Sequence, residues 1–166
     1  MILALACELL HDPLDALTPR LRERAWREID RRVLRPFDTR DDLWWMGLTR
    51  RGLNNWTPWC NSDVMLCFLL MEKDQKRLDK AVAQSVKSMD LFLDYIQKDG
   101  ACEEGPSYWG AAAGKLYDWL QIFHDASDGA FSVFDNPRIR KMGEFISRAY
   151  IGVRYVVTFA DASPLP

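Results

Sequence analysis

Hydrophobic residues recur along most of this chain at the spacing of an α-helix. Between residues 78 and 96 they are separated by three or four positions, and charged residues fill the positions between them. The apolar positions of this stretch are Leu78, Val82, Val86, Met89, Leu93 and Ile96. Such spacing gathers the apolar side chains on one face of a helix. We therefore predict an amphipathic helix here, ended by Asp99 and Gly100.

Proline positions and the same periodicity predict further helices. Thr18 and Pro19 form an N-cap and first-turn pair ahead of a four-residue apolar repeat, which Pro36 ends. The residues after Met1 read as the start of another helix. Three more helices are expected, each with a proline near its first turn, where a missing N–H costs no hydrogen bond. They cover residues 57–71, 106–123 and 137–150.

This pattern predicts an all-α fold. No long stretch alternates with a period of two, although residues 151–159 are rich in β-formers. Neither a shift in composition nor a Gly/Ser linker interrupts the chain, so residues 1–166 are expected to form a single domain. With 48% hydrophobic and 28% charged residues, the chain has the composition of a globular protein with a substantial core.

Composition and short motifs exclude several classes of function. The net charge of −2 provides no bulk positive field for nucleic acid. The longest apolar run, residues 64–71, is far shorter than the roughly 20 residues of a membrane-spanning helix, and no signal peptide is recognised. No HExxH, GxGxxG, GxxxxGK[ST] or GxSxG motif occurs, so we predict no metal and no cofactor. The four cysteines are predicted to be buried free thiols: Cys7, Cys60, Cys67 and Cys102.

Two loops contain residues that helix formation does not require. In the first, Asn54, Asn55 and Trp56 precede Thr57 and Pro58, which are a good N-cap and first helical residue. In the second, residues 99–109, the proline again marks a helix start, which places Tyr108 in the first turn. Helix N-termini favour anions, because backbone N–H groups and the helix dipole point toward the ligand there. Both loops therefore suit a carboxylate ligand.

Removal of a proton next to a carboxylate is chemistry that such residues can perform. In a uronic acid, the charge that develops on loss of the C5 hydrogen spreads onto the carboxylate. Amide donors such as Asn54 and Asn55 stabilise that charge, and donors of this kind are worth about 3–4 kcal/mol in a transition state. Tyr108 is the candidate acid or base. The candidate substrate-binding residues are Trp56 and Trp109 as stacking walls, Glu104, and Arg51 or its neighbour Arg50 as a cation for acidic groups.

Each of these residues also has a plain structural interpretation. An Asn-Asn pair before a helix is most often a capping or turn device. Glu103 and Glu104 can complement a helix dipole, and Tyr108 can be an ordinary half-buried aromatic residue. Their joint occurrence favours a site.

The two loops together resemble the heparinase II/III-like polysaccharide lyases. The resemblance rests on Asn54-Asn55-Trp56 with Cys60-Asn61, and on Asp99-Gly100 with residues 104–109, and extends more diffusely to Phe159-Ala160-Asp161. It implies an incomplete α/α toroid whose groove holds uronate-containing chains. By the same resemblance, Asn54 or Asn55 would neutralise the substrate carboxylate, Tyr108 would be the catalytic acid/base, and the protein would be periplasmic or secreted.

The chain departs from that family in three respects. Ala101-Cys102-Glu103 replaces a glycine-rich approach to the second loop, and neither His11 nor His124 lies in a motif that would supply the family's further catalytic group. The number of expected helices is also about half that of a toroid. We therefore expect a piece of a larger lyase or a shortened relative.

Two alternatives to a lyase stay open. One is a toroid-type glycoside hydrolase that uses Glu103 or Glu104 with Asp63 as its two carboxylates. The other is a carbohydrate-binding or purely structural helical module that performs no chemistry.

Overall fold

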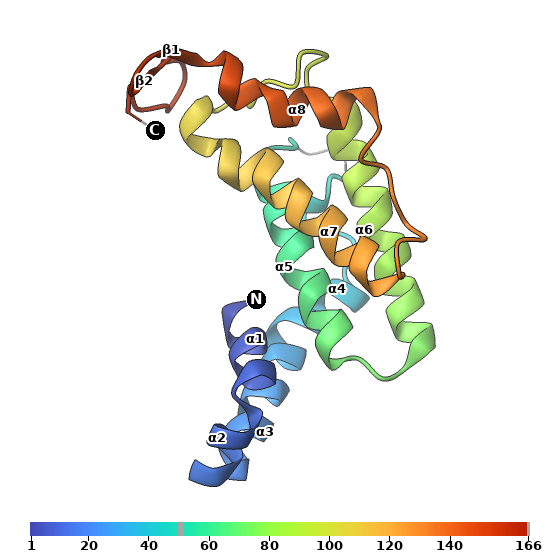
Figure 1. Cartoon of the computed structure of the whole chain (residues 1–166). Coiled ribbons are helices and arrows are strands. Elements are labelled where there is room, and N and C mark those ends of the chain that lie inside the picture. The colour runs from blue at the N-terminus through green and yellow to red at the C-terminus, as the bar shows by residue number, and fades with distance from the viewer. Residues whose placement is uncertain (50–51, 166) are drawn as a thin grey trace.

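The computed structural model describes residues 1–49 and 52–165 and is helical along most of that length (Figure 1). Three short helices come first, α1 (Ile2–Leu9), α2 (His11–Leu17) and α3 (Pro19–Ile29). A π-helical turn, η1 (Asp30–Leu34), leads into α4 (Arg35–Thr39), and a 3-10 turn, η2 (Trp44–Met46), follows. The predicted all-α class is confirmed.

The second half of the chain contains the longer helices. These are α5 (Trp56–Met71), α6 (Gln75–Tyr95), α7 (Lys115–Ala126) and α8 (Pro137–Arg148). A 3-10 turn, η3 (Pro106–Tyr108), and a π-helical turn, η4 (Gly110–Gly114), precede α7. After α8 come a small antiparallel hairpin of β1 (Tyr150–Gly152) and β2 (Tyr155–Val156) and a segment without helix or strand, residues 157–165.

Helix α5 lies at the centre of the molecule, in contact with both α6 and α7. Figure 1 shows α8 crossing one end of these three helices, while α1, α2 and α3 project from the other end. Among the described residues, no helix has the length and apolarity that crossing a bilayer requires.

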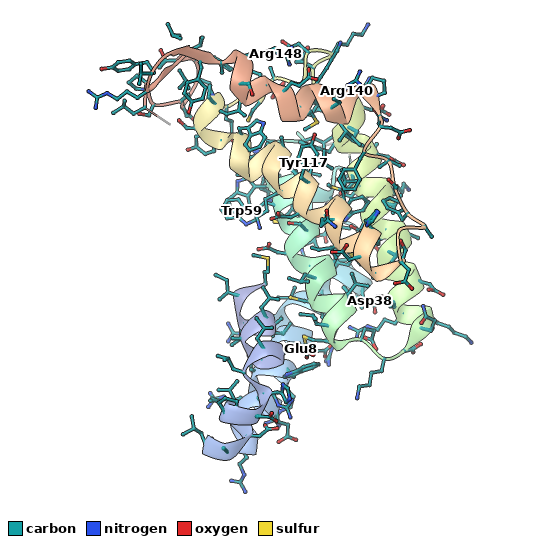
Figure 2. The ribbon with its side chains drawn as sticks, in the orientation of Figure 1. Glu8, Asp38, Trp59, Tyr117, Arg140 and Arg148 are labelled. Carbon is teal, nitrogen blue, oxygen red and sulfur yellow. The ribbon has the colours of Figure 1, made fainter. Side chains whose placement is uncertain are left out.

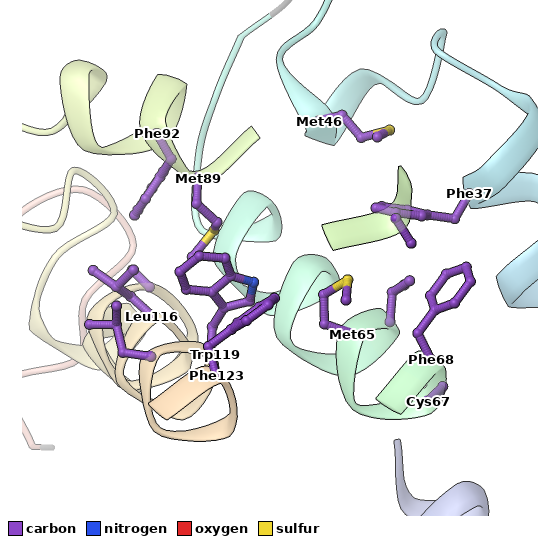
Figure 3. Close-up of a cluster of buried hydrophobic side chains, with 14 of the residues drawn as sticks. Phe37, Met46, Met65, Cys67, Phe68, Met89, Phe92, Leu116, Trp119 and Phe123 are labelled. Atoms are coloured by element: carbon purple, nitrogen blue, oxygen red, sulfur yellow. The ribbon is translucent and has the colours of Figure 1, made fainter. Parts of the chain in front are cut away.

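The core lies where α5, α6 and α7 meet. Figure 3 shows Met65 of α5, Met89 of α6 and Leu116 of α7 among its side chains, all of which are almost completely buried. Phe37 of α4 packs against Phe68 of α5, with ring centroids 5.7 Å apart, and joins the N-terminal elements to this core. Burial of aromatic and aliphatic surface of this kind is the dominant stabilising term.

A polar network crosses the same core. Asn61 of α5 is fully buried, and its Nδ2 donates to the hydroxyl of Ser88 at 2.9 Å and to the carbonyl of Thr57 at 2.9 Å. Ser85 donates to Asn61 Oδ1 and accepts from Trp119 Nε1, both at 2.9 Å. The network binds α5, α6 and α7 together and leaves neither the donor nor the acceptor of the Asn61 amide unpaired.

The helix predicted over residues 106–123 is divided into η3, η4 and α7, so Tyr108 lies on a 3-10 turn and not in the first turn of an α-helix. Two predicted helix ends are also wrong. Pro36 does not end its helix, because the preceding residues widen into η1, and a π turn relieves the clash between a proline ring and the carbonyl four residues earlier. The long amphipathic helix ends at Tyr95, before Asp99 and Gly100. Gly100 instead has φ +79°, and a Cβ there would lie 2.5 Å from the backbone of Lys141. The absence of a side chain at Gly100 therefore lets this loop approach α8 closely.

The cysteines agree with the sequence-based prediction in most respects. All four are free thiols; Cys7, Cys67 and Cys102 are buried and Cys60 is half-buried. Burial, with a smaller contribution from the nearby charge of Asp63, raises the pKa of the Cys60 thiol to about 11, so this thiol is protonated at neutral pH.

Candidate functional site

The first loop forms a tight turn at the start of α5. Asn54 Oδ1 accepts the backbone N–H of Trp56 at 3.0 Å, so α5 begins one residue earlier than predicted. Thr57 is not the N-cap. Its fully buried hydroxyl donates to the carbonyl of Trp45 at 2.7 Å and fastens α5 to η2. The carbonyl half of the Asn54 amide thus supports the backbone, and its Nδ2 has no protein partner within the described residues.

The second loop is held by close backbone contacts. Gly105 has φ +89°, and a Cβ on it would lie 2.5 Å from Ala162 Cβ and 2.7 Å from the carbonyl oxygen of Phe159. The hydroxyl of Ser107 accepts the N–H of Ser163 at 2.9 Å. The C-terminal segment that resembles the lyase family therefore packs directly on the loop that carries the second motif.

The two loops meet at a small cavity. Asn54 and Asn55 line it from the start of α5, and Glu103 and Glu104 line it from the second loop. We call it the Asn55 cavity; Phe92, Tyr95, Ile96, Cys102 and Ala112 complete its lining. Its volume is about 10 Å³, close to the smallest space that holds one water molecule.

Two acceptor atoms at this cavity lack hydrogen-bond partners. Asn55 is only 5% exposed, and its Oδ1 has no partner in the described part of the chain. The same holds for Oε2 of Glu104, a half-buried residue. Buried oxygens without a donor are costly, which distinguishes this pair from ordinary turn residues.

Tyr95 joins the site, although the sequence analysis did not single it out. Its hydroxyl donates to Glu103. Burial, the Glu103 hydrogen bond and the charges of Glu103 and Glu104 together raise the pKa of Tyr95 to about 12, burial contributing most. Tyr95 is therefore a proton donor at neutral pH. In sequence it reads only as the last turn of an amphipathic helix, so no signal marked it.

Tyr108 and Trp109 occupy different environments. Tyr108 lies on η3 with 37% of its surface exposed and is not part of the lining of the Asn55 cavity. Trp109 is half-buried, packs against the core, and donates from Nε1 to the carbonyl of Met142 at 2.8 Å. Trp109 therefore fastens η3 to α8, and the structure presents it as a packing residue more than as a wall for a ligand.

Exposed tryptophans form a surface beside the first loop. Trp44, Trp56 and Trp59 are 41%, 48% and 42% exposed, and consecutive ring centroids are 5.9 and 5.8 Å apart. We call these residues the tryptophan surface. Figure 2 shows Trp59 pointing outward from the helices. Of these three residues only Trp56 was predicted to contact a ligand, because only the fold brings Trp44 and Trp59 next to it.

Two hollows border the tryptophan surface. Trp56, Trp59 and Arg32 line one of about 360 Å³, and Trp59, Lys115 and Gly110 line another of about 520 Å³. Asp63 lines both. Hollows of this size suit a small ligand or a few sugar units. The second reaches η4, close in sequence to Tyr108.

Asp63 does not lie beside Glu103 and Glu104, as the hydrolase alternative requires. It accepts from Lys115 Nζ at 3.3 Å and lines the hollows at Trp59, whereas Glu103 and Glu104 line the Asn55 cavity. The described hollows therefore do not bring the two carboxylates of that alternative to one place. Arg50 and Arg51 lie outside the described residues.

Comparisons with known proteins add no relative. No protein-family model matches the chain, and no curated protein matches it. Within the described residues, no group of three or more His, Cys, Asp and Glu side chains is placed to hold a metal ion. Function is therefore inferred from the site itself.

Proposed function

We propose that this chain is a toroid-type domain of a polysaccharide lyase that cleaves uronate-containing chains by β-elimination. The observation that carries the proposal is that Asn54 and Asn55 meet Glu104 around one small cavity. These residues come from the two separate motifs on which the resemblance to heparinase II/III-like lyases rests. Convergence in space of two distant motifs is expected of a site and is not required by capping. The cavity joins the two loops, and the proposed substrate lies outside it, over the adjoining tryptophan surface.

Asn54 is the residue we assign to the substrate carboxylate. Its Oδ1 is used by the Trp56 N–H, which leaves the Nδ2 group as a donor at the positive end of α5. A donor held in this way can stabilise the charge that grows on a uronate carboxylate as the C5 proton leaves. Asn55 is almost completely buried, which leaves Asn54 as the accessible amide of the pair.

Tyr108 is the acid/base of the proposed reaction, and the tryptophan surface is the proposed platform for neighbouring sugar rings. Tyr108 is exposed enough to reach a ligand. Trp56 follows directly on the Asn54–Asn55 turn, so a chain lying on the indole rings would pass the amide donor. The partner is then an acidic polysaccharide, and the remainder of a larger periplasmic or secreted lyase would supply a further catalytic group.

The product formed from uronate polymers tests this proposal. Heparan sulfate, hyaluronate and alginate are incubated separately with the chain, and ultraviolet absorbance follows the double bond that β-elimination creates. We expect that any such signal is abolished in Tyr108→Phe and unchanged in Tyr155→Phe, a matched exposed tyrosine on β2. New reducing ends without the double bond would indicate hydrolysis and contradict the proposal.

A carbohydrate-binding module without catalysis is the second candidate, and the tryptophan surface specifically favours it. Three neighbouring indoles that each expose more than 40% of their surface suit sugar stacking whether or not chemistry follows. Binding of uronate oligosaccharides that survives in Tyr108→Phe, with no product from either form, would support this candidate.

A further inference from the structure

The Asn55 cavity contains two buried oxygens that lack hydrogen-bond donors in the described part of the chain. Asn55 Oδ1 and Glu104 Oε2 are both acceptors, and neither has a donor within the described residues. Of the donors in the lining, the Tyr95 hydroxyl is bound to Glu103, and the side-chain nitrogens of Asn54 and Asn55 bond neither oxygen. The Cys102 thiol makes no bond to either oxygen, and Phe92, Ile96 and Ala112 have no polar side-chain atoms.

The size of the cavity limits what can supply the missing donor. A volume of about 10 Å³ has room for one water molecule and excludes a sugar ring. A single water has two protons and can donate to both oxygens. Nearly all buried polar groups in native proteins are satisfied by protein or by ordered water, so an occupied cavity is the expected state.

We propose that one bound water molecule bridges Asn55 Oδ1 and Glu104 Oε2, and that Glu104 is thereby a positioning residue for the Asn54–Asn55 turn. The bridge ties the second loop to the start of α5. Its loss frees the backbone turn whose Asn54 amide we assign to the substrate carboxylate. The positioning role rests on the proposed function, whereas the bridge itself does not.

A double-mutant cycle tests the bridge independently of any substrate. Glu104→Ala, Asn55→Ala and the double variant are compared with the parent chain in urea unfolding. Each variant raises the unfolding equilibrium constant by some factor. If both oxygens share one donor, the factor for the double variant is smaller than the product of the two single-variant factors, by more than about threefold. Effects that multiply to within about twofold would overturn the proposal.

A crystal structure of the parent chain identifies the donor. We expect electron density for one water between Asn55 and Glu104, within hydrogen-bond distance of both oxygens. An Asn55 amide turned so that its nitrogen donates directly to Glu104, with nothing between them, would overturn the bridge. This measurement also decides the matter if either alanine variant does not fold.

Carbohydrate affinity tests the positioning role. The probes are hyaluronate, heparan sulfate and alginate hexasaccharides and their carboxyl-reduced counterparts. We expect Glu104→Ala to lower affinity for the best-binding uronate by about tenfold and to leave affinity for its carboxyl-reduced form within about twofold. Glu104→Gln, which keeps an acceptor oxygen, should restore most of the loss. Glu144→Ala, an exposed glutamate on α8, is the matched control.

The two possible failures are distinguishable. A uniform loss of affinity for both forms of the probe would indicate that Glu104 acts only on stability, and would overturn its positioning role. If the parent binds no uronate at all, the proposed function and the positioning role both fail, while the cycle and the crystal structure still decide the bridge.

Discussion

At the scale of single residues, one asparagine serves two purposes. Asn54 uses its carbonyl oxygen to hold the Trp56 N–H and keeps its Nδ2 without a protein partner in the described structure. The capping interpretation and the ligand interpretation of the Asn-Asn pair are therefore compatible. They concern opposite ends of the same amide group, and substitution can separate them.

Asn54→Asp and Asn54→Ala should both lose uronate affinity but differ in stability. Aspartate keeps the acceptor for the Trp56 N–H and adds a negative charge at a helix N-terminus, so we expect unchanged or higher stability. Alanine loses the acceptor of the Trp56 N–H, at about 1 kcal/mol. Both lose the Nδ2 donor, and uronate affinity should fall about tenfold or more, furthest in the aspartate variant. Urea unfolding and titration calorimetry check the two parts; unchanged uronate affinity in Asn54→Asp would contradict the role of the amide.

The phenol of Tyr95 provides a direct check on the second loop. Because burial and its bond to Glu103 raise the pKa of Tyr95 to about 12, Glu103→Gln should lower that pKa toward the ordinary value of 10.0. An ultraviolet titration of parent and variant, with Tyr95→Phe to identify the signal, measures this. Identical titration curves for parent and Glu103→Gln would show that the contact does not form.

The same shift has a consequence for stability at high pH. The folded state holds the Tyr95 proton more tightly than the unfolded state, so the contribution is fully present below pH 10. It is lost as the pH rises from 10 to about 12. Tyr95→Phe should remove this part of the pH dependence, and urea unfolding at several alkaline pH values measures it.

At the scale of elements, the apolar periodicity predicted the helices better than their ends. Helices α5 and α8 begin within one residue of their predicted starts, because a proline in the first turn is a local signal. The end at Pro36 and the role of Gly100 were wrong, because a π turn and a close approach to α8 depend on packing partners far away in sequence. Capping and proline rules use only neighbouring residues, so they cannot predict such long-range contacts.

Asn61 shows the same limit for a motif residue. It belongs to the pattern that resembles the lyase family, yet the structure places it fully buried in the core, hydrogen-bonded to Ser85 and Ser88. A resemblance in sequence does not separate residues that bind a ligand from residues that hold the helices carrying them.

Asn61→Ala should therefore destabilise the fold without acting on a ligand directly. It leaves the partners on α6 unpaired in the core, and we expect a loss of about 2–4 kcal/mol in the free energy of unfolding. Asn136→Ala, which removes only the exposed cap of α8, should cost about 1 kcal/mol and is the matched control. Equal, small losses in urea unfolding would contradict the importance of the polar network.

At the scale of the whole molecule, the all-α class was predictable, and the composition of the site was predictable only in part. Asn54, Asn55 and Glu104 were named from the sequence and do share a cavity. Tyr95, Trp44 and Trp59 were missed because each looks like an ordinary helix or turn residue until the fold brings it beside its neighbours. The α/α toroid and the single domain stay predictions.

Calorimetric titration of the chain with a uronate hexasaccharide and its carboxyl-reduced counterpart tests the central claim most directly. If the Asn54 turn and the tryptophan surface form a uronate site, the parent chain binds the uronate form more tightly, and Asn54→Asp abolishes that preference while it leaves binding of the reduced form intact. Equal affinity for the two forms in the parent chain, or no binding of either, would contradict the account.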